Sequence, residues 1–243
     1  MSVKSALRTL QILEAFAEAR RPMSLGDVAR AIEAPRSSAL ALLATLVERG
    51  YLNRVGPAPS YYPTRRWLDL AHAVSESDPV SLRIRESLER LRDLTGETAI
   101  DAVLATDHSL YLDVVESREL VRFAARPGEP KPLHLSASGR AQLAVLDEGA
   151  RRAVVAALPA GGSGRARPSR KALLDTVEKE RMQGWSTNLG EFRPDVISVA
   201  SGFDLYGTVH SLVVAAPRHR VETKVDQIGR LLRGEARALV ARL

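Results

Sequence analysis

Side chains capable of acid–base or nucleophilic chemistry gather in the stretch HLSASGRA, residues 134–141. Ser136 and Ser138 carry hydroxyl groups and His134 carries an imidazole, which are the groups that a serine hydrolase uses. A nucleophilic serine also needs its base within hydrogen-bond distance, oriented by a third group. None of the five histidines stands in a Gly-x-Ser-x-Gly or Ser-x-x-Lys context. A small-molecule hydrolase is therefore the disfavoured alternative, and it predicts turnover of aromatic esters and amides.

The same stretch allows a second chemistry, the binding of an anion. Small residues that lead into a helix leave backbone N–H groups unpaired at the positive end of the helix dipole. The simpler interpretation is a structural cap, in which the Ser136 hydroxyl accepts from one of these N–H groups. The residues alone leave both interpretations open.

Two short helices are predicted between residues 24 and 50. Ser24 with Asp27 three places on forms a capping box, in which Asp replaces the usual Glu or Gln. Pro35 disfavours helical angles at the residue before it and suits the first turn of a new helix, and Gly50 is a C-terminal cap. Helical spacing gives each helix an apolar stripe, one at Leu25, Val28, Ala29 and Ile32 and one at Ala39, Leu42, Leu43 and Leu46. Two such helices joined by a turn of about three residues form a helix-turn-helix.

The next segment, YLNRVGPAPSYYPT at residues 51–64, predicts a strand, a turn and a returning strand. The turn contains Gly56, Pro57 and Pro59, and Tyr61 and Tyr62 open the return strand. The helix pair alone is equally compatible with an ordinary helical hairpin, but a hairpin directly after it indicates the wing of a winged helix-turn-helix. Arg54, Arg65 and Arg66 lie in or beside this wing, where phosphate contacts are expected.

The second helix is predicted to read DNA bases. Its candidate base-reading residues are Arg36, Ser37, Ser38 and Thr45, and Leu40 and Ala41 are predicted to face outward beside them. An exposed leucine is usually incidental surface. On a recognition helix, however, apolar groups can also contact thymine methyl groups. Both roles remain open for Leu40 and Ala41.

Length and composition suit two modest domains, since the chain has 243 residues of which 45% are hydrophobic. The absence of cysteine excludes disulfides, thiolate catalysis and Cys-ligated metals, and we expect no cofactor and no metal. The net charge is +6, and residues 1–78 hold ten Lys or Arg against eight Asp or Glu. So mild a charge is typical of a solvated surface. DNA binding must therefore depend on geometry and on dimerisation, which doubles the phosphate contacts.

No apolar run approaches the ~20 residues of a membrane span, and the first residues, MSVKSALRTL, lack the apolar core of a signal peptide. We expect a cytoplasmic protein without a membrane partner.

Further along the chain, helices and strands alternate. An opening helix over residues 3–19 is apolar on more than one face, and a helix over 67–74 leads to a break at residues 75–79. Beyond the break, helices are predicted at 82–94, 137–146, 148–158, 169–183 and from 221 to the end. Strands are predicted at 97–104, 109–115, 121–125, 197–203 and 208–216, with loops at 126–132 and 159–169.

This mixture predicts an α/β protein of the α+β kind, with an antiparallel sheet flanked by helices. The expected division is a winged helix-turn-helix domain at residues 1–63, a linker helix at 64–79 and a second domain at 80–243.

Several segments together resemble one family over essentially the whole chain. They are VKSALRTLQILEAF, SLGDVARAIEAPRSSALALLATLVERGYL, LRDLTGETAIDAVL, YLDVVES and PLHLSASGRAQLA, in the family's order and spacing. The chain resembles an IclR-type transcriptional regulator, of the isocitrate-lyase-regulator family. The resemblance implies an N-terminal winged helix-turn-helix and a C-terminal, GAF-like effector-binding domain. It also implies homodimers, commonly paired into tetramers, that bind double-stranded operator DNA and small carboxylates and act on metabolic operons.

The resemblance also implies an effector site. Ala137 and Ser138, with Gly139 in the same turn, would supply backbone N–H groups to a carboxylate. The other carried-over positions are Asn188, where an acidic residue is frequent, Ser198, where Cys is frequent, Val213 and Ala215, which are Ser in some members, and the apolar wall positions Phe123 and Val196. Fewer hydroxyls and less negative charge predict an aromatic or similarly apolar monocarboxylate of a catabolic operon, rather than pyruvate or glyoxylate. Whether the protein represses or activates is left open.

Overall fold

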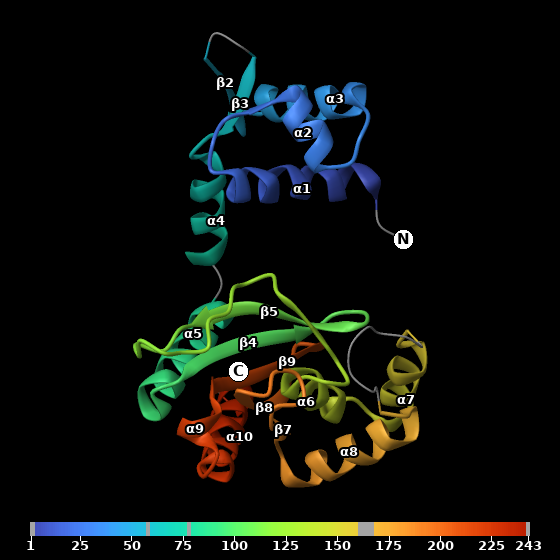
Figure 1. Ribbon diagram of the computed structural model, residues 1–243, viewed down its shortest axis with the longest axis vertical. Helices are drawn as coiled ribbons and strands as arrows, with labels where there is room; N and C mark the ends of the chain where they lie inside the picture. The colour runs from blue at the N-terminus through green and yellow to red at the C-terminus, as the bar shows by residue number, and fades with distance from the viewer. Residues whose placement is uncertain (1–2, 57–58, 77–78, 160–167, 242–243) are drawn as a thin grey trace. The chain divides into compact units, whose positions relative to one another are not determined.

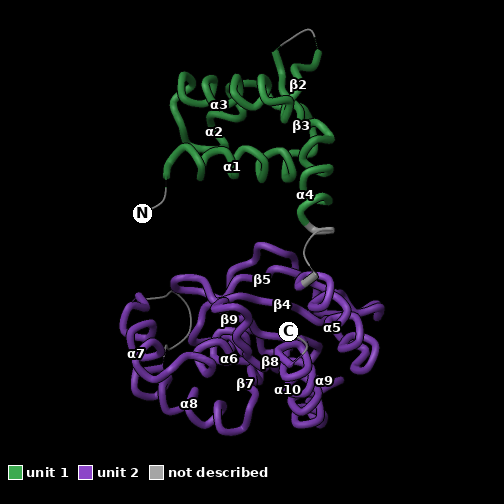
Figure 2. Tube along the Cα trace, turned by 180° about the vertical axis from the view of Figure 1, so that it is seen from behind, with its two compact units in different colours: residues 1–79 green, residues 80–243 purple. Residues whose placement is uncertain are grey.

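The computed structural model describes residues 3–56, 59–76, 79–159 and 168–241. The chain forms two compact units, Met1–Pro79 and Val80–Leu243, which Figure 2 colours separately. The predicted wing turn at Pro57, the predicted break at residues 77–78 and residues 160–167 of the predicted polar loop lie outside the described residues.

Unit 1 is a helical domain with a small sheet (Figure 1). Its elements are α1 (Lys4–Ala19), β1 (Met23–Ser24), α2 (Leu25–Ala31), α3 (Arg36–Glu48), β2 (Leu52–Val55), β3 (Ser60–Pro63) and α4 (Arg66–Glu76). The antiparallel sheet has the order β1-β3-β2. Ile12, Val28 and Leu43 are fully buried in its core, because the apolar stripes of α1, α2 and α3 converge there. The winged helix-turn-helix fold predicted for this part of the chain is confirmed.

Local capping explains where α2 and α3 begin and end. The capping box at Ser24 is present, because the Ser24 hydroxyl accepts from the Asp27 N–H at 3.2 Å and the Asp27 carboxylate accepts from the Ser24 N–H at 3.1 Å. At the end of α3, Gly50 has a φ of +74° and the Tyr51 N–H donates to the Leu46 carbonyl at 2.8 Å. This is the glycine cap that the sequence predicts.

The end of α2 has a different cause from the one expected. The prediction relied on Pro35, but α2 already ends at Ala31 and Glu33 adopts a left-handed φ of +46°. The Ala34 N–H then donates to the Ala29 carbonyl at 3.0 Å and closes the helix. The left-handed backbone conformation costs free energy for residues other than glycine. The turn therefore depends on Glu33 as well as on proline.

The first turn of α4 is anchored to unit 1. The Trp67 indole N–H donates to the Tyr51 carbonyl at 2.8 Å, and the two rings lie 4.4 Å apart. Thr64, just before the helix, donates its hydroxyl proton to the Gly50 carbonyl at 2.6 Å. The start of α4 is thus held to the residues that cap α3.

Unit 2 is a six-stranded antiparallel sheet covered by helices (Figure 1). Its strands, in the order β6-β5-β4-β9-β8-β7, are β4 (Thr98–Leu104), β5 (His108–Val115), β6 (Pro130–Pro132), β7 (Ser186–Asn188), β8 (Val196–Leu205) and β9 (Thr208–Pro217). The helices are α5 (Pro79–Thr95), α6 (Ala137–Val145), α7 (Glu148–Ala157), α8 (Arg170–Gln183), α9 (Arg218–Val221) and α10 (Val225–Ala241). The antiparallel sheet flanked by helices is confirmed.

Alternating residues give the sheet two buried faces. On β4, Ala99 packs in one apolar cluster with residues of α5 and α10, whereas Ile100 and Ala102 pack in another with residues of α6. A third cluster, which includes Leu143 of α6 and Val177 of α8, lies on the outer side of α6. α6 therefore lies between the sheet and α8.

The strand predicted at residues 121–125 is wrong, because these residues form no strand. Side chains take the place of a neighbouring strand. The Thr98 hydroxyl donates to the Phe123 carbonyl at 2.6 Å, and the Arg220 guanidinium donates to the Val121 carbonyl at 2.8 Å. Three short strands, β1, β6 and β7, were not predicted, because two or three residues are too few for an alternating pattern.

Removing residues 1–78 should leave unit 2 folded, because its apolar clusters are built from its own residues. We expect the truncated protein to retain helical and strand circular dichroism and to unfold cooperatively in urea. The full-length chain measured in parallel is the control. A product without a cooperative transition would contradict the predicted boundary at residues 75–79.

Candidate functional site

The outward face of α3 carries the residues predicted to read DNA bases. Ser37, Leu40, Ala41 and Thr45 are exposed, and the Leu40 side chain is 45% accessible. They are exposed because the opposite side of α3 is buried in the core of unit 1 at Ala39, Leu43 and Leu46. Ser38 is half-buried beside Ala39.

Two of these residues already have protein contacts. The Thr45 hydroxyl donates to the Ala41 carbonyl one turn earlier at 3.0 Å, so its only proton is used and it can act only as an acceptor. Arg36 begins α3, and a β-carbon added to Gly26 would lie 3.6 Å from one of its terminal nitrogens. The Arg36 side chain therefore lies against the first turn of α2.

The three arginines beside the wing differ in their partners. Arg54 is exposed on β2, Arg65 forms an exposed ion pair with Asp69 at 3.3 Å, and Arg66 lies 5.0 Å from the centre of the Tyr51 ring. An exposed ion pair is worth only ~0–1 kcal/mol. Arg65 can therefore exchange Asp69 for a phosphate at little cost.

The beginning of α6 is capped in the way that the simpler interpretation of HLSASGRA predicts. The Ser136 hydroxyl accepts from the Gly139 N–H at 3.0 Å and donates to the Pro132 carbonyl at 2.8 Å. The Ser138 hydroxyl donates to Ser136 at 3.2 Å. Neither serine donates its proton to a histidine, so the hydrogen bonds of a hydrolase nucleophile are not formed.

The cap leaves two backbone donors of α6 available. The N–H groups of Ala137 and Ser138 meet no acceptor within the described part of the chain. Gly139 is different, because its N–H is used by Ser136 and a β-carbon on it would lie 2.7 Å from the Leu133 carbonyl oxygen. Gly139 thus serves close packing of α6 against the preceding loop, and its N–H is not free for a ligand.

A small cavity of about 30 Å³ lies beside this helix start. It is lined by Tyr111, Phe123, Lys131, Ser136, Asn188, Phe192, Arg193, Val196, Ser198 and Ala215. Five of the residues predicted for an effector site are thus brought to one cavity, although they lie on a loop, on β7, on β8 and on β9.

Four residues predicted for the effector site do not line this cavity, namely Val213 and the three residues of the α6 start, Ala137, Ser138 and Gly139. The Val213 position is set by its packing. Its side chain is buried in one apolar cluster with Ala137, Ala141 and Ala200, between the sheet and α6. Val213 and Ala215 face the same side of β9 but lie about 7 Å apart along the strand. Ala215 reaches the cavity, whereas Val213 supports the helix.

Asn188 organises the loops around the cavity. Its amide nitrogen donates to the Leu135 carbonyl, and its amide oxygen accepts from the Gly190 N–H at 3.2 Å. An acidic residue here would place a carboxylate against the Leu135 carbonyl without a proton between them. An amide therefore suits this position better than an acid does.

One side of the cavity is cationic, which was not predicted from the sequence. Lys131 on β6 is largely buried, forms an ion pair with Glu129 at 2.7 Å, and places its ammonium group 4.9 Å from the centre of the Tyr111 ring and 5.8 Å from that of Phe192. Partial burial acts to raise the pKa of Glu129, but the hydrogen bond and charge of Lys131 outweigh it and lower that pKa. Lys131 escaped notice because it stands between two prolines in a stretch expected to be a loop.

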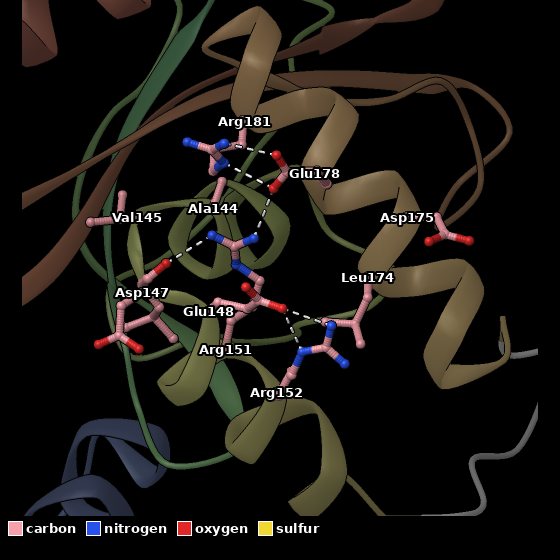
Figure 3. A pocket seen from close by; sticks show the side chains of 11 residues that line it. Ala144, Val145, Asp147, Glu148, Arg151, Arg152, Leu174, Asp175, Glu178 and Arg181 are labelled. Atoms are coloured by element: carbon pink, nitrogen blue, oxygen red, sulfur yellow. Dashed lines mark hydrogen bonds and ion pairs between the residues drawn. The ribbon is translucent and has the colours of Figure 1, made fainter.

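A larger cavity of about 570 Å³, shown in Figure 3, lies between α7 and α8. Its guanidinium groups are already committed. Arg151 donates to the Leu143 and Leu146 carbonyls at 3.0 and 2.8 Å and pairs with Glu178, which Arg181 also contacts at 2.7 Å. Three arginines face four carboxylates in this lining. The cavity is therefore a structural ion network and a poor site for an anion.

Because of this network, the stability of the protein should fall at acid pH. Hydrogen bonds from Arg181 and from Arg151 lower the pKa of Glu178 from 4.5 to about 2. Since the folded pKa is depressed, the stabilisation is complete above pH 4.5 and is lost as the pH falls towards 2. We expect the difference in Tm between wild type and Glu178→Gln to shrink over that window and to shrink at every pH in 1 M salt. A difference independent of pH would contradict the assignment.

Neither a metal site nor a membrane helix is found in the part of the chain that the structure describes. No cluster of three or more His, Asp or Glu side chains there could hold a metal ion. No helix there is both long enough and apolar enough to cross a membrane.

Comparison with known families gives two matches that follow each other along the chain. Residues 5–56 match the IclR helix-turn-helix domain, and residues 72–241 match the bacterial transcriptional regulator IclR C-terminal domain. Among curated proteins, "Probable transcriptional regulator SauR" of Cupriavidus necator is 33% identical over 156 residues, which are 64% of this chain and 62% of that protein. The "Pca regulon regulatory protein" of Pseudomonas putida is 28% identical over 202 residues, 81% of this chain and 67% of that protein.

Solved structures agree with these matches. An IclR transcriptional regulator from Alicyclobacillus acidocaldarius superposes with a TM-score of 0.81 at 20% identity and covers 99% of both chains. One from Silicibacter sp. TM1040 gives 0.74 at 26% identity and covers 98% of this chain and 95% of the other. Because the C-terminal family match alone spans more than half of the chain and a helix-turn-helix match precedes it, the protein belongs to the IclR family of transcriptional regulators.

Proposed function

We propose that this regulator binds operator DNA through α3 and the wing, and that a small aromatic monocarboxylic acid bound beside α6 controls its DNA affinity. The observation that carries the effector class is the adjacency, through the shared residue Ser136, of a helix start with two available N–H groups, those of Ala137 and Ser138, and a cavity lined by three aromatic residues. The genes that it regulates would be those of a catabolic operon.

The start of α6 and the aromatic residues of the neighbouring cavity suit the two ends of an aromatic acid. A carboxylate is stabilised by free N–H groups at the positive end of a helix dipole. An aromatic ring gains from edge-to-face or offset contact with Tyr111, Phe123 and Phe192. Ala215 adds no hydroxyl to this wall, which favours an apolar ligand over pyruvate or glyoxylate.

One solved relative supports an aromatic effector. An IclR homologue from Microbacterium hydrocarbonoxydans has been solved in complex with 4-hydroxybenzoate, and it superposes with a TM-score of 0.77 at 24% identity over 97% of both chains.

Effector binding has to rearrange the cavity. Its volume of about 30 Å³ is far below the roughly 150 Å³ of an engineered cavity that accepts benzene. Phe192 and Arg193 are exposed lining residues, so they can move outward at lower cost than the buried ones. A ligand that favours the opened form changes DNA affinity only by its differential affinity for the two states, typically ~1–3 kcal/mol.

Calorimetry on the full-length protein tests the effector class. We expect benzoate, 4-hydroxybenzoate or phenylacetate to bind, and pyruvate and glyoxylate to bind at least tenfold more weakly (about 1.4 kcal/mol). Ala215→Ser should weaken the aromatic acid about fivefold, since a few tens of Å² of apolar contact are worth about 1 kcal/mol. Binding of the small acids alone would overturn the aromatic assignment.

Gel-shift titration tests the DNA interface, with the promoter upstream of the gene itself or of a neighbouring operon as the probe. Arg36→Ala should weaken binding, because the arginine begins the helix that enters the major groove. Arg118→Ala is a matched control, since Arg118 is an exposed arginine of unit 2. Equal affinity of the Arg36 variant and wild type would show that α3 is not the recognition helix.

Specific binding also requires two copies. A dimer must match half-sites about 34 Å apart or a multiple of that distance. α1 exposes Leu7 and Leu10 beside the buried Ile12 and Phe16, so apolar surface remains for a partner subunit. Sedimentation at micromolar concentration should give a dimer or tetramer, and a strict monomer would argue against this mechanism.

A further inference from the structure

The outward face of α3 is unusual in having almost no charge. Among its 13 residues only the first and last, Arg36 and Glu48, are charged. α8, which has 14 residues, carries seven charged ones. A helix face in contact with water alone is normally rich in charged and polar residues. The composition of α3 therefore suits a face that contacts another molecule and not water alone.

The middle of this face also offers no hydrogen-bond donor. Its exposed residues are Leu40, Ala41, Ala44 and Thr45. The first three have apolar side chains, and the hydroxyl proton of Thr45 is donated to the Ala41 carbonyl. What remains is a row of methyl groups with one acceptor oxygen.

The base edges of the major groove differ in what they demand of a protein. Guanine presents two acceptors, adenine an acceptor and a donor, cytosine a donor, and thymine an acceptor with a methyl group. A donor-free apolar face cannot pair with the purine acceptors. The thymine methyl is the one feature of these edges that an apolar side chain complements.

We propose that Leu40, supported by Ala41 and Ala44, determines specificity by packing on thymine methyl groups in the centre of each operator half-site. Polar recognition is then confined to the helix start, at Arg36 and Ser37. This inference rests on the proposed function, since it names what α3 recognises in DNA. It makes Leu40 a specificity residue of the interface.

The test removes only the methyl group from the DNA. Full-length protein selects binding sites from a random double-stranded pool, and the selected site is resynthesised with deoxyuridine in place of one thymine at a time. Affinity is measured by fluorescence anisotropy. At the contacted thymine, wild type should lose about fourfold in affinity, since one buried methyl group is worth about 0.8 kcal/mol. Substitution of the contacted thymine in both half-sites should lower the affinity about fifteenfold.

A double-mutant cycle assigns the contact to Leu40. The Leu40→Ala variant changes an exposed residue and should fold normally. For this variant, the thymine-to-uracil substitution at the same position should lower DNA affinity less than twofold. Leu120→Ala is the matched control, because Leu120 is 96% exposed in unit 2, and it should retain the full effect. If no single substitution weakens wild type, or if Leu40→Ala keeps the full sensitivity, the inference is overturned.

The same experiment gives a different result if the proposed DNA binding itself is wrong. In that case the wild-type protein selects no site from the pool at all, and uracil substitution is never reached. A protein that selects a site but ignores thymine methyls binds DNA as proposed and reads it by other contacts.

Discussion

Gly202→Ala is expected to destabilise unit 2 by about 3 kcal/mol or more. Gly202 lies on β8 where α6 crosses the sheet, and a β-carbon there would overlap the Ala141 carbonyl oxygen and lie 2.6 Å from Cγ2 of Val145. Backbone cannot move aside as the end of a side chain can, so α6 would have to lift from the sheet. Because the start of α6 borders the cavity proposed for the effector, binding of an aromatic acid should be lost as well.

Gly234→Ala is the matched control for this prediction. Gly234 lies in the interior of α10, and apart from its chain neighbours and the backbone of its own helix no heavy atom lies within 4 Å of the place where its β-carbon would be. Here the substitution should stabilise the protein by about 0.5–1 kcal/mol, because alanine loses less backbone entropy in a helix than glycine. Urea denaturation of both variants measures the two opposite shifts. A Gly202→Ala protein as stable as wild type would show that α6 does not pack as closely as described.

The second large effect is expected for Glu180→Ala, which should cost unit 2 about 3–5 kcal/mol. Glu180 on α8 pairs with Arg140 on α6 at 3.1 Å, and the two side chains are only 11% and 7% exposed. The Arg140 guanidinium also donates to the His134 and Thr187 carbonyls. Without Glu180 a buried guanidinium keeps its carbonyl partners but loses its counter-ion, and that loss is the main cost.

An exposed pair on the same helix provides the comparison. Asp175→Ala removes an ion pair with Lys171 whose two side chains are 59% and 88% exposed, so it should cost less than about 1 kcal/mol. Glu180→Gln separates charge from hydrogen bonding, because the amide can still accept from the Thr187 N–H, which donates to Glu180 at 3.1 Å. Equal urea midpoints for Glu180→Ala and Asp175→Ala would show that the Arg140 pair is not buried in solution.

The sequence by itself determined the DNA-binding unit, because its signals act over a few residues. The capping box of Ser24 and Asp27, the glycine cap at Gly50 and the stripe that buries Leu43 all appear in the structure as predicted. The two caps are contacts between residues that are near neighbours along the chain, and the stripe follows from helical spacing alone. The cap of α6 at Ser136 was predictable for the same reason.

Only the tertiary structure decided what surrounds the cavity of unit 2. Lys131 and Tyr111 meet there because β6 pairs with β5. This pairing could not be predicted, because a strand of three residues is too short to show a pattern in the sequence. Val213 and Ala215 look equivalent in the sequence, yet α6 covers the first and leaves the second at the cavity. Residues 121–125 have the pattern of a strand but form none, because Thr98 and Arg220 bind their carbonyls from distant parts of the chain. Which groups become neighbours across such distances depends on how helices and strands pack, and that is a property of the whole fold.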